Sequence, residues 1–496
     1  MAGLKQIAPE QFGFDQARHL LWRAGFGGTP DQIQLLASWG PERSVDHLLD
    51  SSKGGAEPVR ADEFDKDIMR PPSEDERRML DQARRAQNEE ALARARAEVQ
   101  RREQEDRRQV RKVQRWWLTR MIETPAPLQE KMTLFWHGHF ATSYRTIENS
   151  YHMFLQNQLF RKHAVGSYAD LLRAIIRDPA MIAYLDNNDS RRGRPNENLA
   201  REVMELFSLG VGNYTEKDIK EGARALTGYT FRDDEFYFDQ RNHDTGGKVI
   251  LGRSGEIDGD GFVDAILAQR ACGDYMTSKL YRFFARDLPD DERAIDRDTR
   301  DALRSLASTF RASEYSTRAM LRELFLSEHF YSPEVMNEQI KSPVVLIVGA
   351  IRSLNAPPRD LSILLDAIDL MGQNILYPPS VAGWDGGRSW INTSTMFIRQ
   401  NIMNYLLTGR KPQGYDALAD KQQFDPMPLL DGLKSAGAID AGRAVEYLLR
   451  LTIGRAPDGH KAVLTKFFDD HEGRVEPSLV TGALLLISAM PEYQLC

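Results

Sequence analysis

Apolar residues recur at intervals of three or four over most of this chain, which is the spacing of one buried helix face. In the stretch 196–210 these positions are Leu199, Val203, Leu206 and Leu209. Similar patterns cover residues 14–50, 128–185 and 262–355. The sequence therefore predicts a mainly α, multi-helical globular protein.

Strand-forming residues are concentrated in one short region. Tyr229, Phe231 and the run Phe236–Phe238 precede an Asp-Thr-Gly-Gly turn, and the apolar run 249–251 follows it. Aromatic and β-branched residues that flank a glycine turn are typical of a hairpin. We expect one β-hairpin near residues 229–252.

A long charged segment runs from residue 73 to residue 123 without glycine or proline. Ser73 is a typical helix cap, and the middle of the segment is rich in Arg, Glu, Gln and Ala. The heptad trace is broken, because Arg102 and Asp106 occupy positions where apolar residues are expected. Two interpretations stay open: a solvated arm or two helices folded back, and a helical hairpin or coiled coil that binds a partner.

These segments suggest four parts. We expect N-terminal helices that pack on the core, an insertion-like charged helical arm, a central helical core with the hairpin, and a small C-terminal helical unit. Their predicted boundaries are 1–60, 61–124, 125–410 and 411–496.

Composition excludes several classes of protein. The net charge of −7 argues against a general nucleic-acid binder, and no apolar run has the length of a membrane span. The N-terminus lacks the apolar core of a signal peptide, so we expect a cytoplasmic protein unless a partner carries it out. Two cysteines alone cannot form a thiolate zinc site.

The helix predicted near residue 200 carries closely spaced charges beside its apolar stripe. Glu202 and Glu205 share a face, and Arg201 lies four residues from both Glu197 and Glu205. Charged groups that are buried need partners. They form either a salt-bridge cluster or part of a metal site, in which the free carboxylate of Glu202 or Glu205 would be the catalytic base.

His137 and His139 are the clearest metal-ligand signal. Side chains two residues apart point the same way on an extended segment and diverge on a helix. Gly138 favours a bend or an extended stretch, so both rings could reach one divalent transition metal. The alternative is that the ring nitrogens hydrogen-bond to nearby carboxylates.

Two loops complete the candidate site. His243 is a third predicted metal ligand, while the neighbouring Asp244 and Lys248 could contact a bound ligand. The tryptophan-rich loop around Trp384 suits a sugar or peptide ligand, and Arg201 is a further candidate contact. The alternatives are a turn stabilised by Asp244 and a packed loop that covers the core.

Several motifs occur in the order found in one bacterial family. They are His19–Pro30, Phe135–Phe140, Asn196–Gly210, His243–Gly252, Tyr377–Trp384 and Pro491–Gln494. Together they resemble the DUF1800 family, a domain of unknown function. The resemblance implies a mostly helical fold. It also implies a protein partner resembling the alkaline-phosphatase/sulfatase superfamily, which is often encoded beside family members.

Two functions remain open. The first is a metal-dependent enzyme or metal-binding protein with a His/Glu site. The second is a non-enzymatic scaffold or assembly partner that docks through the charged arm. They differ in whether the His and Glu side chains meet at one point in space.

Overall fold

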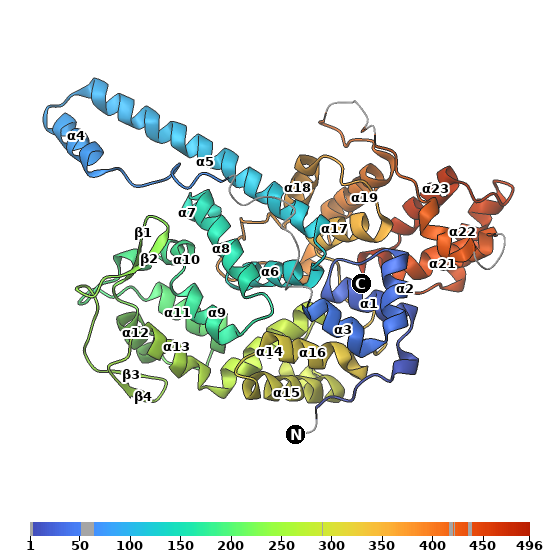
Figure 1. The fold of residues 1–496 in the computed structure, drawn as a ribbon, viewed down its shortest axis with the longest axis horizontal. Coiled ribbons are helices and arrows are strands. Elements are labelled where there is room, and N and C mark those ends of the chain that lie inside the picture. Colours follow the sequence, from blue (N-terminus) through green and yellow to red (C-terminus); the bar gives the residue numbers. More distant parts are fainter. Residues whose placement is uncertain (1–2, 51–63, 290, 416–419, 421, 435–438) are drawn as a thin grey trace.

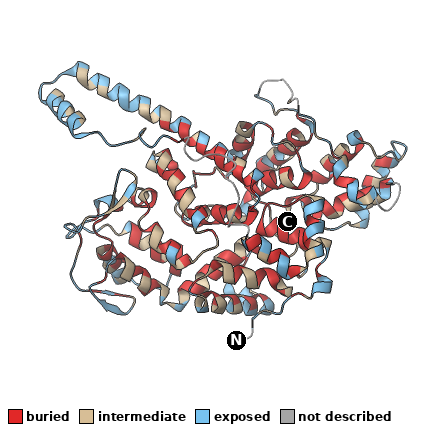
Figure 2. Ribbon diagram, viewed as in Figure 1, coloured by how far each residue is buried: buried red, intermediate tan, exposed pale blue. Residues whose placement is uncertain are grey.

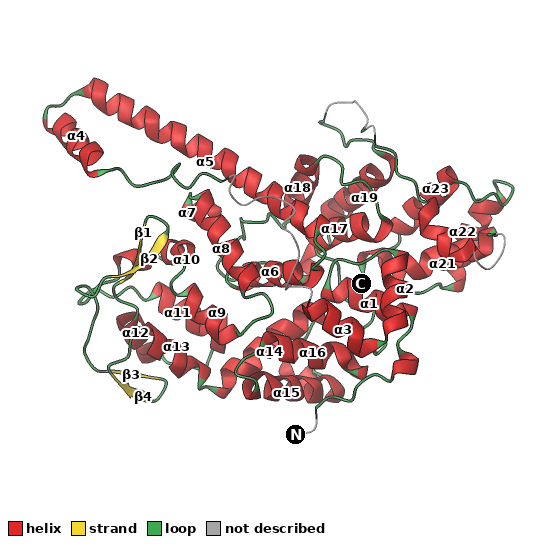
Figure 3. Cartoon of the chain, viewed as in Figure 1, coloured by secondary structure: helices red, strands yellow, loops and turns green. Residues whose placement is uncertain are grey.

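The computed structural model describes residues 3–50, 64–289, 291–415, 420, 422–434 and 439–496. Helices dominate this part of the chain, and the strands are few and short (Figure 3). The mainly α fold predicted from the sequence is therefore confirmed. The first three helices are α1 (Phe14–Ala24), α2 (Pro30–Trp39) and α3 (Pro41–Asp50).

Helix starts coincide with the capping residues in the sequence. The Thr29 side chain accepts a hydrogen bond from the Gln32 backbone at the start of α2, and Pro30 occupies the first helical position. Ser73 and Glu76 form the same reciprocal pair at the start of α4 (Glu74–Arg85). Such caps satisfy backbone N–H groups that have no partner within the helix.

The charged arm is a pair of helices, α4 and α5 (Glu89–Glu123), that fold back on each other and project from the body (Figure 1). None of the α4 residues is buried (Figure 2). Val99, which belongs to the heptad trace, is 52% exposed. The coiled-coil expectation therefore finds no support, because the two helices bury no continuous apolar seam.

The second half of α5 belongs to the core. Asp106 is buried and accepts hydrogen bonds from the Ser150 backbone N at 3.0 Å, from Ser150 Oγ at 2.6 Å and from Tyr144 Oη at 2.8 Å. From there inward Val110, Val113 and Trp117 are buried. The projecting arm thus ends near residue 105, and Asp106 anchors α5 to the body.

The central part of the chain is a set of packed helices. Up to the strands these are α6 (Pro127–His139), α7 (Tyr144–Ile147), α8 (Ser150–Lys162), α9 (Tyr168–Ile175), α10 (Pro179–Tyr184), α11 (Asn198–Met204) and α12 (Glu216–Ala225). After the strands come α13 (Gly259–Leu267), α14 (Arg270–Phe284), α15 (Arg297–Ala312), α16 (Thr317–Leu326), α17 (Pro343–Leu354), α18 (Leu361–Leu370) and α19 (Thr393–Thr408).

The region predicted as one hairpin forms two. Strand β1 (Tyr229–Arg232) pairs with β2 (Glu235–Phe238), and β3 (Lys248–Ile250) pairs with β4 (Arg253–Gly255), both antiparallel. The expectation of a single hairpin was wrong, because each half of the region turns back on itself. The Asp-Thr-Gly-Gly segment connects the two hairpins and is not the turn of either.

The chain ends in a small group of helices on the side of the molecule where the chain colours turn orange and red (Figure 1). They are α20 (Asp431–Lys434), α21 (Ala441–Ile453), α22 (Asp458–Asp469) and α23 (Pro477–Ser488). The buried Arg18 of α1 donates hydrogen bonds to the Leu451 and Thr452 carbonyls of α21, both at 2.8 Å. The first helix of the chain is thereby joined to the C-terminal group of helices.

Buried apolar side chains from all parts of the body form one connected core. The four predicted parts stay predictions, and the boundary between residues 60 and 61 lies outside the described residues. Among the described helices, none has the length and apolarity that crossing a membrane requires.

Candidate cavity between helices α6 and α14

A cavity of about 900 Å³ lies between α6 and α14. Volumes of this size are typical of small-molecule sites. One face of α6 lines it through Lys131, Phe135 and His139, which are spaced four residues apart. One face of α14 lines it with the series Ala271, Asp274, Tyr275, Ser278, Lys279, Arg282 and Phe283. The helical period therefore places all these side chains on two facing walls.

His139 is fixed in this cavity by the end of the glutamate-rich helix. That helix finishes in a π-helical turn, Glu205–Leu209. The Phe207 carbonyl accepts hydrogen bonds from His139 Nε2 at 2.9 Å and from Tyr168 Oη at 2.6 Å. Because a carbonyl only accepts, Nε2 carries the ring proton. Burial, with Lys279 nearby, lowers the pKa of His139 to about 3, so the ring is neutral near pH 7.

Side chains also cap the last carbonyls of this helix. Tyr275 Oη donates to the Leu206 carbonyl at 2.8 Å, and Asn213 Nδ2 donates to the Leu209 carbonyl at 3.0 Å. Gly210 then turns with φ +77°, and a Cβ there would lie 2.8 Å from a Tyr275 ring carbon. Only glycine fits this position. The helix end is therefore locked against α14.

His137 lies on the other side of α6 and holds the tryptophan loop. Its Nε2 accepts the Leu376 backbone N–H at 3.0 Å, and its ring meets the Trp384 ring edge-on at 5.5 Å. Burial lowers the pKa of His137 to about 3. The extended conformation expected for His137 and His139 was wrong, because both belong to the last turn of α6. Their rings consequently point to different partners.

Backbone contact explains the glycine before Trp384. Gly383 has φ +78°, and a Cβ on it would lie 2.1 Å from the Gly138 carbonyl oxygen. The loop therefore rests directly on the end of α6, where any larger residue would clash. This contact brings Trp384 and the buried Trp390 to the cavity wall. The Trp384 indole N–H has no hydrogen-bond partner among the described residues.

The inner wall of the cavity is cationic. Burial lowers the pKa of Lys131 to about 8, while a charge at Cys496 favours the ammonium and Arg23 opposes it. Lys131 Nζ lies 5.0 Å from the centre of the Phe26 ring and 5.7 Å from that of Phe283. No hydrogen bond or ion pair joins this ammonium to a described residue. Its protein contacts are thus aromatic rings.

Lys279 and Arg282 continue this cationic wall one turn apart on α14. Burial and the nearby Arg282 lower the pKa of Lys279. The Lys279 ammonium lies 5.3 Å from the centre of the Tyr275 ring. In the described part of the chain neither cation is paired with a carboxylate. The acid on the same helix face, Asp274, is engaged by Arg311 at 2.5 Å.

Apart from Asp274, the acidic side chains that line the cavity lie at its exposed rim. Asp287, Glu292 and Asp385 line it and are exposed to solvent. Lys131 is 4% exposed by comparison. The exposed acidic side chains therefore lie at the mouth and the cationic side chains further in, where a charge at Cys496 also acts on Lys131.

The predicted glutamates lie outside this lining. Burial, and then the charge of Glu205, raise the pKa of the half-buried Glu202. Glu205 accepts a hydrogen bond from Tyr214 Oη. Arg201 pairs with Glu197 at 3.3 Å and with a residue of α12, Glu216, at 2.9 Å. The arginine therefore joins two helices instead of neutralising the predicted Glu202–Glu205 pair.

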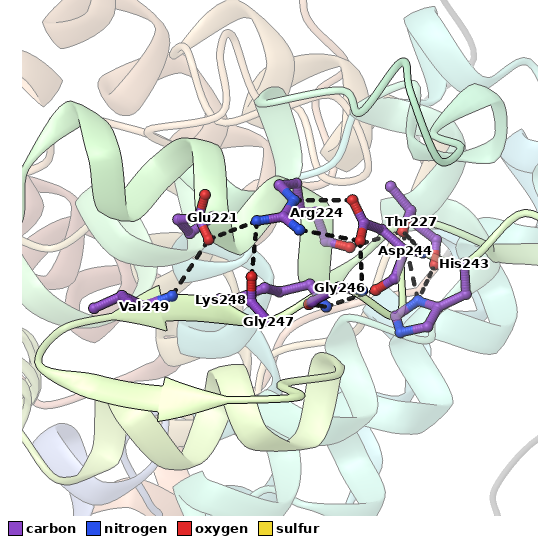
Figure 4. A network of polar contacts seen from close by, with 9 residues as sticks. All are labelled: Glu221, Arg224, Thr227, His243, Asp244, Gly246, Gly247, Lys248 and Val249. Atoms are coloured by element: carbon purple, nitrogen blue, oxygen red, sulfur yellow. Dashed lines mark hydrogen bonds and ion pairs between the residues drawn. The ribbon is translucent and has the colours of Figure 1, made fainter.

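His243, Asp244 and Lys248 form a separate polar network (Figure 4). Thr227 O accepts a hydrogen bond from His243 Nδ1 at 2.8 Å, and Asp244 is paired with Arg224 at 2.8 Å. Lys248 Nζ donates to the Asp244 carbonyl at 2.6 Å. These contacts hold the segment that connects the two hairpins against α12, and none of the three predicted residues lines the cavity.

The predicted metal ligands therefore do not share one point. His139 faces the cavity, His137 faces the Trp384 loop, and His243 belongs to the α12 network. Within the described residues, no group of three or more His, Cys, Asp or Glu side chains could hold a metal ion. The geometry gives the His/Glu metal centre no support.

The three cations of the inner wall were not among the site residues predicted from the sequence. The available signal was their spacing: Lys131 precedes His139 by eight residues, and Lys279 precedes Arg282 by three. Both spacings keep side chains on one helix face. No spacing rule, however, connects two helices that are about 140 residues apart in the chain.

Segments from three of the motifs meet at this cavity: the end of α6, the end of the glutamate-rich helix and the loop that carries Trp384. Comparisons with curated proteins and with solved structures find no match to the chain. A protein-family comparison does, over residues 19–495. The chain therefore belongs to the DUF1800 family, described as proteins of unknown function.

Proposed function

We propose that this protein binds a small anionic ligand in the cavity between α6 and α14. The observation that carries the proposal is the inner wall, where Lys131, Lys279 and Arg282 line one cavity without a paired carboxylate among the described residues. Cations that are removed from water and left unpaired destabilise a fold. A bound anion would offset that cost.

The charge distribution also suggests how the ligand is oriented. The acids Asp287 and Asp385 are at the exposed rim, so an anionic group is favoured inside the cavity and disfavoured at its mouth. Apolar and aromatic surface of the cavity wall comes from Phe135, Tyr275 and Trp384. A ligand with a phosphate, sulfate or carboxylate group on an organic body matches this lining.

Calorimetric titration tests the proposal with inorganic phosphate, sulfate and citrate as probes. We compare the wild type with the double variant Lys279→Met and Arg282→Met. The matched control is Lys217→Met with Arg297→Met, which removes one exposed lysine and one exposed arginine from other helices. We expect at least one probe to bind the wild type and the control equally, and the cavity variant at least about tenfold more weakly.

Two results would count against the proposal. One is the absence of binding by all three anions to the wild type. The other is equal loss of affinity in the control and the cavity variant, which would place the anion on the general surface of the protein.

Two expectations from the sequence stay predictions beside this proposal. They are a bound divalent transition metal, and a protein partner resembling the alkaline-phosphatase/sulfatase superfamily. Plasma mass spectrometry of the purified protein tests the first, since about one equivalent of a transition metal would restore that hypothesis.

A further inference from the structure

Lys131 differs from the other lysines that line the cavity. Lys341 Nζ donates to the Tyr493 carbonyl at 2.7 Å and lies 4.2 Å from the centre of the Trp22 ring, so it is part of the packing. Lys279 is less buried and has Arg282 beside it. Lys131 alone of these three combines near-complete burial, aromatic neighbours and no hydrogen bond to a described residue.

A lysine amine in such surroundings loses its proton more readily than an exposed one. Burial lowers the pKa of Lys131 to about 8. Lowering the pKa from 10.5 to about 8 increases the fraction of free amine at neutral pH about 300-fold. Lysines activated by desolvation are the usual partners of carbonyl compounds in covalent catalysis. The cations one helix away, Lys279 and Arg282, supply a place for an anionic group on the same molecule.

We propose that Lys131 is a nucleophilic lysine, and that the cavity accepts an aldehyde or ketone that also carries an anionic group. The Nζ lone pair attacks the carbonyl carbon, a C–N bond forms as the C=O π bond breaks, and a proton moves from the nitrogen to the carbonyl oxygen. The resulting carbinolamine loses one water, leaving an imine between Lys131 and the ligand. No electrons are transferred and no further reactant is needed. The placement of the anionic group rests on the proposed anion site.

The experiment uses pyridoxal 5′-phosphate, an aldehyde with a phosphate, followed by borohydride to reduce any imine to a stable secondary amine. Peptide mass spectrometry then measures the label on each lysine. We expect Lys131 to carry at least about ten times more label than the exposed Lys217 at limiting reagent. Inorganic phosphate should protect Lys131 and leave Lys217 unchanged.

A conservative variant separates reactivity from folding. Lys131→Arg keeps the positive charge but cannot form an imine, so it should lose this label while its circular dichroism spectrum stays that of the wild type. If the variant does not fold, protection of the wild type by phosphate provides the same test. Labelling of Lys131 no stronger than that of Lys217 would overturn the inference.

The phosphate-free aldehyde pyridoxal distinguishes this inference from the proposed function. Equal labelling of Lys131 by pyridoxal and by its phosphate would keep the reactive amine and refute the anion site. Calorimetric binding of phosphate that depends on Lys279 and Arg282, without any label on Lys131, would keep the anion site and refute the reactive amine.

Discussion

The projecting arm and the cavity are both rich in charged side chains, yet these differ in exposure to solvent and in ion pairing. In the arm Arg101 pairs with Glu98 at 2.6 Å and with Glu105 at 2.5 Å, all on one exposed helix face. In the cavity Lys131 is buried and Lys279 is partly buried, and neither is paired with a carboxylate of the described residues. Exposed pairs contribute little to stability, whereas buried unpaired cations destabilise unless something binds them.

The body between these regions shows a third arrangement, in which a buried carboxylate is paired with two arginines. Glu130 of α6 is 0% exposed and accepts hydrogen bonds from Arg120 and Arg161 of the neighbouring helices and from Trp117 Nε1. Charge content alone therefore does not identify a functional site. Several cations that line one cavity without a paired carboxylate among the described residues set this region apart from the arm and from the Glu130 cluster.

The largest effect is expected where buried charges are paired. Glu130→Gln leaves Arg120 and Arg161 without their anion and should lower the free energy of unfolding by about 3–5 kcal/mol. Burial would raise the pKa of Glu130, but Arg161 and Arg120 outweigh it and hold that pKa below its ordinary value. This contribution is therefore present above pH ~4.5 and is lost as the pH falls further.

Urea unfolding at pH 7 measures this change, with Glu98→Gln on the exposed arm as the matched control. A Glu130 variant as stable as the control would show that burial and pairing do not distinguish the body from the arm.

An intermediate effect is expected from the neutral histidine of the cavity. The pKa of His139 is lowered to about 3 from 6.5, so the unfolded chain takes up its proton first as the pH falls. The folded state should therefore lose about 1–2 kcal/mol relative to the unfolded state between pH ~6.5 and ~5.

The variant His139→Gln tests this, because its amide can still donate to the Phe207 carbonyl. Unfolding curves recorded over this pH range should be flatter for the variant. An equally steep dependence in both proteins would contradict a neutral, buried His139.

A smaller effect, opposite in sign, is expected from the cationic wall. Without any added anion, Lys279→Met should stabilise the fold by about 1 kcal/mol, because it removes a desolvated ammonium. With saturating phosphate the wild type should gain stability that the variant does not gain. Thermal unfolding with and without phosphate measures both changes, and strong destabilisation of the ligand-free variant would mean that the ammonium already has an internal partner.

The smallest effect is expected in the arm. Arg102 donates hydrogen bonds to the Ile68 and Arg70 carbonyls, so the two chain segments at the base of the arm are adjacent. Replacing residues 71–101 by a short Gly-Ser linker should therefore leave stability within about 1 kcal/mol and phosphate binding unchanged. A matched, longer deletion extends to residue 115. It also removes the buried Asp106 and should unfold the protein. Loss of phosphate binding in the shorter deletion would contradict the independence of the two regions.

Local features could be predicted from the sequence because they depend on neighbouring residues. The start of α2 at Thr29 and Pro30 is one example, and the family motifs are another. The conformation at Gly138 was predicted incorrectly, because a glycine was taken as a break in a segment that continues as helix. Gly383, by contrast, must be glycine because its backbone packs against Gly138, which is distant in the sequence.

The cavity depends on such distant contacts throughout. Lys131 and Lys279 line the same cavity only when α6 and α14 pack together. No local sequence pattern encodes that packing. Asp106 offered a signal in the sequence. A charged residue at an apolar heptad position needs a buried hydrogen-bond partner where the helix enters the core. From the sequence Asp106 was interpreted only as a break in the heptad trace, and the sequence did not reveal Ser150 and Tyr144 as its partners.

The most direct test of the account is to locate a bound anion by anomalous diffraction from crystals that contain selenate, a heavier analogue of sulfate. The account predicts a peak between α6 and α14 within hydrogen-bond reach of Lys279 or Arg282, and its loss in the Lys279→Met and Arg282→Met double variant. Peaks confined to exposed arginines, with an empty cavity at the same selenate concentration, would contradict it.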